Sequence, residues 1–414
     1  MSPADLRAIL ADKLTVAAEI EHGVLCQYLY AALSLKKNPE EGVTWVQLER
    51  MRGWEAAILK IARQEMEHLG IVCNLLSALG GAPHFGRPPM PLPPGFYGVG
   101  ARFTLEPFSV AALRRFVRLE HPADGPVLAT LAPDGVALLQ GRASIAELYL
   151  EIRKLVESTD DAFWLGPSSA QIVTQMLNPA PGQRTVYDVS LPAVIDQKSA
   201  LAAVDQVLIE GEGTDGHRQG SHFAVFHHIL EELEAELERE PGFEPARPIV
   251  ANPTLDDRGH VGQTELTAPA TRALARVFDR SYGVMLVMLA RYYVHTDETP
   301  AELSTLQTTA FFPSMTLLIR PIAEMLTLLP ASSDPSAGNA GPPFTPPRAT
   351  LFLPDKRSAW RVIAEQLDQI AADCAALVPT DYPAVLRPRV QMLLENTGRM
   401  AANFRAAMLV GGDA

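Results

Sequence analysis

Apolar residues recur three and four positions apart along most of the chain, which is the period of an amphipathic α-helix. The spacing is continuous over residues 4–35 and 45–79. Shorter helices are predicted after Ser109 and Ser144, because serine commonly caps a helix N-terminus. Further helices are predicted at residues 191–213, 221–240, 267–295, 301–329, 356–378 and 383–409. No clear alternation of apolar and polar residues predicts a strand.

Passages rich in proline and glycine separate these helices at 80–100, 241–264 and 332–347. The first cannot be helical, because proline lacks an N–H donor and clashes with the preceding turn. Its length after the second helix fits a long crossover between helices of a bundle. The pattern therefore predicts an all-α protein, with a four-helix bundle over 1–240 and a helical extension over 241–414 that packs on it.

Composition narrows the class of protein. The 414 residues include 35 Lys and Arg against 48 Asp and Glu, a net charge of −13, which disfavours a nucleic-acid partner. Cys26, Cys73 and Cys374 are too far apart to support a disulfide framework or a thiolate zinc site. No apolar run has membrane-spanning length and the N-terminus does not resemble a signal peptide. We expect a cytoplasmic protein with no membrane partner.

Candidate chemistry comes from charged residues on apolar helix faces. Glu21 lies on a face with Leu14, Leu25 and Tyr28. A carboxylate in such a stripe is costly to bury unless a partner compensates its charge, and a metal ion is an efficient partner. Glu21 is therefore a candidate metal ligand.

Glu65 and His68 repeat this feature on the second helix. Ile61 and Val72 share their apolar face, and the E-x-x-H spacing puts both side chains within reach of one metal. The alternative is a buried structural ion pair. Glu19 and His22 have the same spacing but do not share the apolar face of Glu21, so we interpret them as solvated or as a support behind the ligands.

The later helices offer a second such pair. Glu212 continues the buried row of residues 191–213, and His222 lies on an apolar face with Phe226. The glycine-rich sequence between them must bulge outward if both are to reach one site. A helix-end surface acid and a core histidine are the alternatives for Glu212 and His222.

The helix at 144–158 adds Glu147 or Glu151. A helical wheel puts Glu151 nearer the apolar face, although neither is central. The collected set is thus four carboxylates and two imidazoles from four helices, an inventory typical of ferritin-like dinuclear sites. Such ligands suit two iron ions, with manganese or a mixed manganese–iron pair as alternatives.

Four stretches also carry a family resemblance. These are AAEIEHGVLCQYLYAALSL, ILKIARQEMEHLGIVCNLLSALGGAPHF, SIAELYLEI and DQVLIEGEGTDGHRQGSHFAVF. They resemble the ferritin-like domain family that includes the ferritin-like region of iminophenylpyruvate dimer synthase, an enzyme of bisindole pigment biosynthesis. The metal set that the resemblance implies is Glu21, Glu65, His68, Glu147, Glu212 and His222. It prefers Glu147 over Glu151, and Glu210 stands where the resemblance leads us to expect Gln.

The first functional hypothesis is a dinuclear non-haem oxidoreductase that uses O2 to oxidise a small organic substrate in specialised-metabolite biosynthesis. One alternative is an iron-handling protein without organic catalysis, and another is a metal-free helical scaffold. The sequence leaves open the substrate, the electron donor and whether the chain forms a homo-oligomer.

Overall fold

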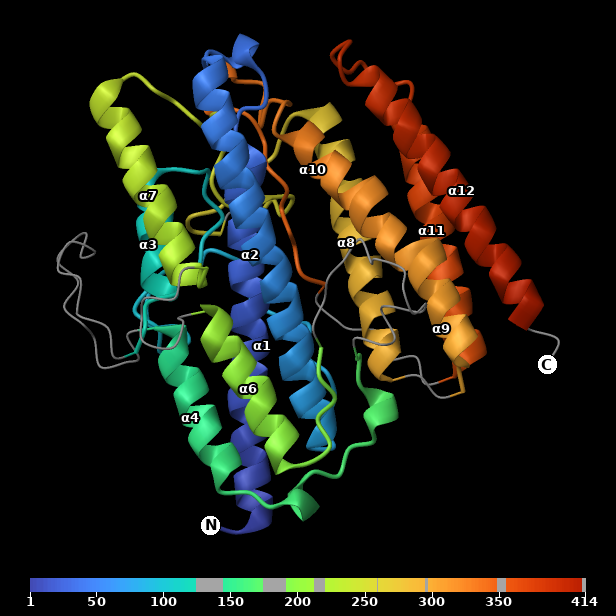
Figure 1. Ribbon diagram of the computed structural model, residues 1–414. Helices are drawn as coiled ribbons and strands as arrows, with labels where there is room; N and C mark the ends of the chain where they lie inside the picture. Colours follow the sequence, from blue (N-terminus) through green and yellow to red (C-terminus); the bar gives the residue numbers. More distant parts are fainter. Residues whose placement is uncertain are drawn as a thin grey trace. The chain divides into compact units, whose positions relative to one another are not determined.

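The computed structural model describes residues 1–123, 144–173, 191–211, 220–258, 260–294, 297–347 and 355–411 (Figure 1). The chain divides into two compact units, one made of residues 1–168 and 189–251 and the other of 169–188 and 252–414. Among the described helices, none combines the length and the apolar character that a membrane span requires.

Two long helices, α1 (Pro3–Ser34) and α2 (Trp45–Ala78), form the centre of the first unit. Each begins at a capping box, in which Ser2 or Thr44 accepts a backbone N–H of the first turn. The start of α1 lies beside the end of α2, since Arg7 donates to the carbonyl of Leu79 at 2.8 Å. The two helices are therefore antiparallel.

The third and fourth helices of the bundle are each built from two pieces. They are α3 (Val110–Leu119) with α4 (Ile145–Glu157), and α6 (Gln197–Gly211) with α7 (His222–Arg239). Figure 1 shows α3 beyond α4 and α7 beyond α6 along the bundle. The helix ends that result lie near the middle of the bundle, where they can present side chains to its core.

Cross-helix contacts give the direction of these pieces. From Lys13 to Tyr28 along α1, the partners change from Glu151 of α4 to Glu120 at the end of α3, so the third helix is antiparallel to α1. It is consequently parallel to α2, and residues 79–109 must return along the bundle to start it. This arrangement confirms the predicted four-helix bundle with a long crossover.

The second unit is also helical. Its elements are β1 (Pro253–Thr254), β2 (Thr264–Glu265), α8 (Pro269–Tyr293), α9 (Pro300–Leu306), α10 (Arg320–Leu326), α11 (Lys356–Leu377) and α12 (Arg387–Gly411). The two short strands pair in parallel, a pairing too short to leave an alternating pattern in the sequence. The predicted helix 301–329 is divided by π-helical segments on both sides of Pro313, which has no N–H for a regular helical hydrogen bond.

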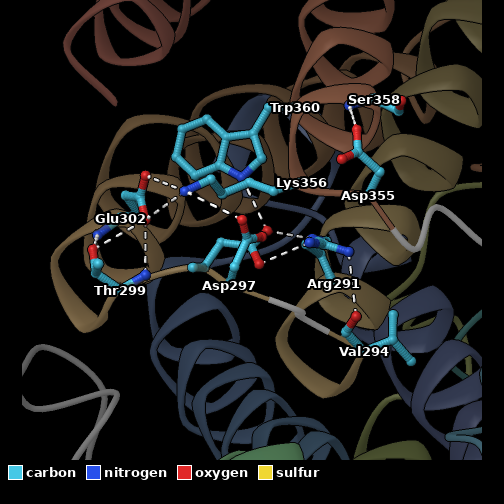
Figure 2. Close-up of polar contacts among 10 residues, drawn as sticks. Arg291, Val294, Asp297, Thr299, Glu302, Asp355, Lys356, Ser358 and Trp360 are labelled. Carbon is cyan, nitrogen blue, oxygen red and sulfur yellow. Dashed lines mark hydrogen bonds and ion pairs between the residues drawn. The ribbon is translucent and has the colours of Figure 1, made fainter. Parts of the chain in front are cut away.

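A buried ion pair joins segments of this second unit, and Figure 2 shows the side chains of Arg291 and Trp360 that meet there. Arg291 of α8 donates through Nη2 to Glu298 at 2.7 Å, and Trp360 of α11 donates to the same carboxylate at 3.2 Å. The Arg291 and Glu298 side chains are 2% and 0% exposed. The carboxylate therefore links α8, the segment before α9, and α11.

Most predicted helices match the structure within a few residues. The helix expected from residue 191 begins instead at Gln197. The reason is local, because the Asp196 carboxylate accepts the N–H of Ser199 at 2.7 Å and caps the helix there.

Candidate metal centre

Three buried side chains of the bundle meet at one point. Glu65 and His68 come from α2 and His222 from α7, and one ligand atom of each lies within 4.8 Å of the others. Glu65 and His68 are one turn apart on the face of α2 that points into the bundle. His222 is the first residue of α7, directly after the N-cap Ser221. The start of that helix therefore fixes the position of the imidazole.

Glu65 lies between the two imidazoles. Its Oε2 is 2.9 Å from Nδ1 of His68, and its Oε1 is 2.9 Å from Nδ1 of His222. The two rings are stacked, with centroids 5.4 Å apart. One carboxylate thus offers a separate oxygen to each histidine.

A second carboxylate stands beside His68. Oε2 of Glu21 is 3.7 Å from His68 Nδ1, while its other oxygen accepts the hydroxyl of Tyr149 at 2.5 Å. The Tyr149 hydroxyl therefore fixes the outer oxygen and leaves the inner one beside the imidazole. We name Glu65 Oε2, His68 and Glu21 the His68 half-site.

The same arrangement is repeated around His222. Oε2 of Glu120 is 3.6 Å from His222 Nδ1, and its other oxygen accepts the hydroxyl of Tyr28. Glu65 Oε1, His222 and Glu120 form the His222 half-site. Each half-site thus contains one oxygen of Glu65, one imidazole Nδ1 and one carboxylate held by a tyrosine.

Glu120 was not among the residues predicted for the site. It follows the last residue of α3 and is only 7% exposed. A signal was present in the sequence, because Glu120 continues the apolar face formed by Leu113, Phe116 and Val117. Helical periodicity gives no assurance of burial at a helix end, so the pattern alone does not single out Glu120 as a ligand.

Three other residues, Glu147, Glu151 and Glu212, are also predicted ligands. Glu151 is 42% exposed and pairs with Lys13 at 2.6 Å on the surface of the bundle. Glu147 is half-buried in the first turn of α4 and is not among the residues that line the cavity of the cluster. Their placement gives no support to either as a ligand. Glu212 lies outside the described residues, so its assignment stays a prediction.

The other E-x-x-H pair does not reach the cluster. His22 is buried, not solvated, and its Nδ1 lies 2.9 Å from the carbonyl oxygen of Phe85 in the crossover. Burial lowers the pKa of His22 to about 3, so the ring is neutral. Glu19 instead pairs with His84 at 3.1 Å. These contacts attach the crossover to α1.

Burial and neighbouring charges shift the pKa values of the side chains in the cluster. Burial raises the pKa of Glu21 to about 8. Burial also opposes the charged forms of Glu65 and His222, but their mutual attraction is stronger. The attraction between the two side chains lowers the pKa of Glu65. Together with the charge of Glu120, it raises the pKa of His222 to about 9. The pKa of His68 is also raised, mainly by Glu65 against the effect of burial.

Glu21, Glu65, His68 and Glu120 line a cavity with about 330 Å³ of empty space, part of it open to solvent. Its apolar wall comes from the third and fourth helices. The wall residues are Leu119, Ile145, Ala146, Val207 and Leu208. Polar ligand atoms and hydrocarbon side chains thus share the lining of this cavity.

The residues fit a pair of metal ions. Nδ1 of His222 and Oε1 of Glu65 are buried and 2.9 Å apart, yet neither has an aligned hydrogen bond among the described residues. Such buried, unsatisfied atoms are costly unless another group binds them. Three carboxylates and two imidazoles directed at one point provide the oxygen and nitrogen donors that iron and manganese accept.

Comparison with known proteins identifies the family of this chain. A model of the Ferritin-like family matches residues 14–231, more than half of the chain. The chain belongs to the ferritin-like family. This membership confirms the predicted fold class and the family resemblance.

Two curated relatives match most of this ferritin-like chain. It is 31% identical over 399 residues to 2-imino-3-(indol-3-yl)propanoate dimerase of Chromobacterium violaceum, covering 91% of this chain and 38% of that protein. It is 28% identical over 422 residues to dichlorochromopyrrolate synthase of Lentzea aerocolonigenes, covering 91% and 40%. The chain therefore spans about two fifths of the length of these relatives.

A solved structure is also similar to this ferritin-like chain. It is a ferritin-like protein from Caulobacter vibrioides, with 20% identity and a TM-score of 0.44. The match covers 73% of this chain and 94% of the other.

Proposed function

We propose that the bundle holds a dinuclear metal centre and that the protein is an oxidoreductase. The observation that carries the proposal is the position of Glu65, whose two oxygens each lie 2.9 Å from a different imidazole Nδ1. A carboxylate shared in this way suits two ions, one for each half-site. Two iron ions are the proposed occupants, because oxygen and imidazole donors favour iron or manganese.

The proposed ligands differ from the predicted set at the third helix. Glu21, Glu65, His68 and His222 are retained, and Glu120 replaces Glu147 because it lies 3.6 Å from His222 Nδ1. One ion would be held by the His68 half-site and the other by the His222 half-site. Glu212 remains a predicted additional ligand outside the described residues.

When bound, such a metal pair supplies redox chemistry with O2. The chain's own side chains prepare the site for it. Tyr149 and Tyr28 each occupy one oxygen of a ligand carboxylate and so orient the other inward. The apolar wall, which includes Ile145 and Leu208, limits the access of water to the ligands.

The relatives suggest the class of substrate. One is named for the dimerisation of an indole-bearing imino acid and the other for the synthesis of dichlorochromopyrrolate. Both names describe enzymes that build small organic molecules, which supports a biosynthetic enzyme. An imino acid of the kind in the first name is the substrate class that we propose.

Metal content is the first test of the proposal. The purified chain, loaded with Fe²⁺ under anaerobic conditions and desalted, should retain two ions per chain by elemental analysis. Glu65→Ala should lose both ions, because both half-sites use its carboxylate. Glu151→Ala, which removes an acid paired with Lys13 at the surface, is the matched control and should retain both.

Two outcomes would contradict the proposal. Absence of bound metal in the wild-type chain would remove the basis for redox chemistry. Iron retained far beyond two ions per chain would instead favour storage, which is the alternative function. Oxygen consumption that depends on both the metal and an indole-bearing imino acid would support the enzymatic proposal directly.

A further inference from the structure

The two imidazoles of the cluster differ in the contacts of their Nε2 atoms. His68 has its Nδ1 toward Glu65, and its Nε2 lies 3.1 Å from Oε2 of Glu210 on α6. The Nδ1 and Nε2 atoms are on opposite sides of an imidazole ring. Glu210 therefore contacts the ring from behind, while the opposite edge faces the shared carboxylate.

Glu210 is itself held in place. Its Oε1 accepts the side-chain amide of Gln206, one turn earlier on α6, at 3.3 Å. The Glu210 side chain is 23% exposed, so water reaches it more easily than it reaches the ligands. It is also absent from the residues that line the cavity. A row of side-chain hydrogen bonds thus runs from Gln206 through Glu210 to Nε2 of His68.

His222 lacks an equivalent contact within the part of the chain that the structure describes. Its Nε2 is buried and has no hydrogen-bond partner there. The half-sites are otherwise closely matched, since each contains an oxygen of Glu65 and a carboxylate held by a tyrosine. Among the residues that the structure describes, the contact with Glu210 is therefore the clearest difference between the half-sites.

We propose that Glu210 is a positioning residue that makes the His68 half-site the tighter of the two metal positions. This inference rests on the proposed dinuclear centre. Glu210 accepts the proton of His68 Nε2–H, which leaves the lone pair of Nδ1 directed at the metal position. A carboxylate behind a ligand imidazole fixes its tautomer and orientation and increases its basicity as a ligand. Loss of such a contact typically lowers metal affinity by about 10- to 100-fold.

Titration of the metal-free chain with Mn²⁺ and, separately, Zn²⁺ tests this role. In the wild type, two binding events of different affinity are expected by calorimetry and chelator competition. Glu210→Ala should weaken the tighter event by about 10- to 100-fold and change the weaker event little. Glu210→Gln should restore much of the affinity, because its amide oxygen can still accept the Nε2 proton.

A spectroscopic readout separates positioning from a general loss of structure. In the zinc-loaded wild type, ¹⁵N-detected NMR should show His68 as the Nε2–H tautomer with a slowly exchanging proton. Glu210→Ala should speed that exchange while circular dichroism and the unfolding temperature stay close to the wild-type values. Gln206→Ala should produce a smaller change in the same signal, and Glu151→Ala should produce none.

The inference is overturned if Glu210→Ala leaves both affinities unchanged or weakens both equally. It is also overturned if Glu210→Gln behaves as Glu210→Ala does, because the acceptor role would then be unimportant. A wild-type chain that binds no metal overturns the proposed centre together with this inference. A wild-type chain with two ions and an unaffected Glu210→Ala variant overturns the role of Glu210 alone.

Discussion

The hydroxyl of Tyr28 donates to Oε1 of Glu120, which connects the interior of α1 to the end of α3 across 92 positions of sequence. The contact leaves Oε2 of Glu120 facing His222 at 3.6 Å. A side chain just beyond a helix end would otherwise have considerable freedom, and the tyrosine removes it. Its counterpart, Tyr149, holds Glu21 in the same way in the other half-site.

Tyr28→Phe should lower the affinity of the His222 half-site for its ion by about 10-fold, because Glu120 loses the donor that orients it. The ring itself should remain packed against Phe116 and Phe226, whose centroids are 4.7 and 4.8 Å away. Calorimetric titration with Mn²⁺ checks this prediction.

The matched control is Tyr30→Phe on the same helix. Its hydroxyl donates to the carbonyl of Val250, away from the cluster. That variant should lose about 1 kcal/mol of unfolding free energy and bind both ions as the wild type does. Equal effects of the Tyr28 and Tyr30 variants on metal affinity would argue against the orienting role.

Glu120→Ala should reduce metal content from two ions per chain to one, because the His222 half-site loses a carboxylate that the structure brings beside the imidazole. Glu147→Ala and Glu151→Ala should both retain two ions, because the two proposed half-sites are complete without either residue. Elemental analysis after desalting measures the difference. Loss of an ion in Glu147→Ala with full occupancy in Glu120→Ala would restore the sequence-based assignment.

Metal uptake should release protons and become tighter as the pH rises from about 6 to 9. Without metal, the pKa of His222 is raised to about 9, mainly by Glu65 against the effect of burial, and burial raises the pKa of Glu21 to about 8. Below these values the groups carry protons that a metal must displace, so acid weakens binding. Calorimetry in buffers of different ionisation enthalpy counts the protons, and zero release at pH 7 would contradict the prediction.

Glu298→Ala should destabilise the second unit by about 3–5 kcal/mol, because it removes the buried carboxylate that pairs with Arg291, which Figure 2 labels. Glu365→Ala is the control, since the side chains of Glu365 and its partner Arg361 are 59% and 77% exposed and such a pair contributes about 1 kcal/mol or less. Urea unfolding measures both variants. Replacing the pair together, as Arg291→Met with Glu298→Leu, should recover much of the loss.

The limits of the sequence-based prediction are visible in Glu65 and Glu120. Glu65 could be predicted because its apolar neighbours lie on the same helix, where a fixed period relates sequence to direction. Glu120 has the same kind of apolar neighbours, but it lies at a helix end, where the period gives no assurance of burial. Glu147 and Glu151 were selected from the second piece of that helix, where the residue that reaches the site is Tyr149.

The sequence by itself determined the helices, the crossover and the presence of Glu21, Glu65, His68 and His222 on buried faces, because helical periodicity is a local property of the chain. The tertiary structure decided how these groups meet: Glu65 between two imidazoles, Glu120 beside one of them and Glu210 behind the other. Those contacts join residues on different helices. They depend on where helices begin, end and pack against one another, and no spacing within a single helix specifies that.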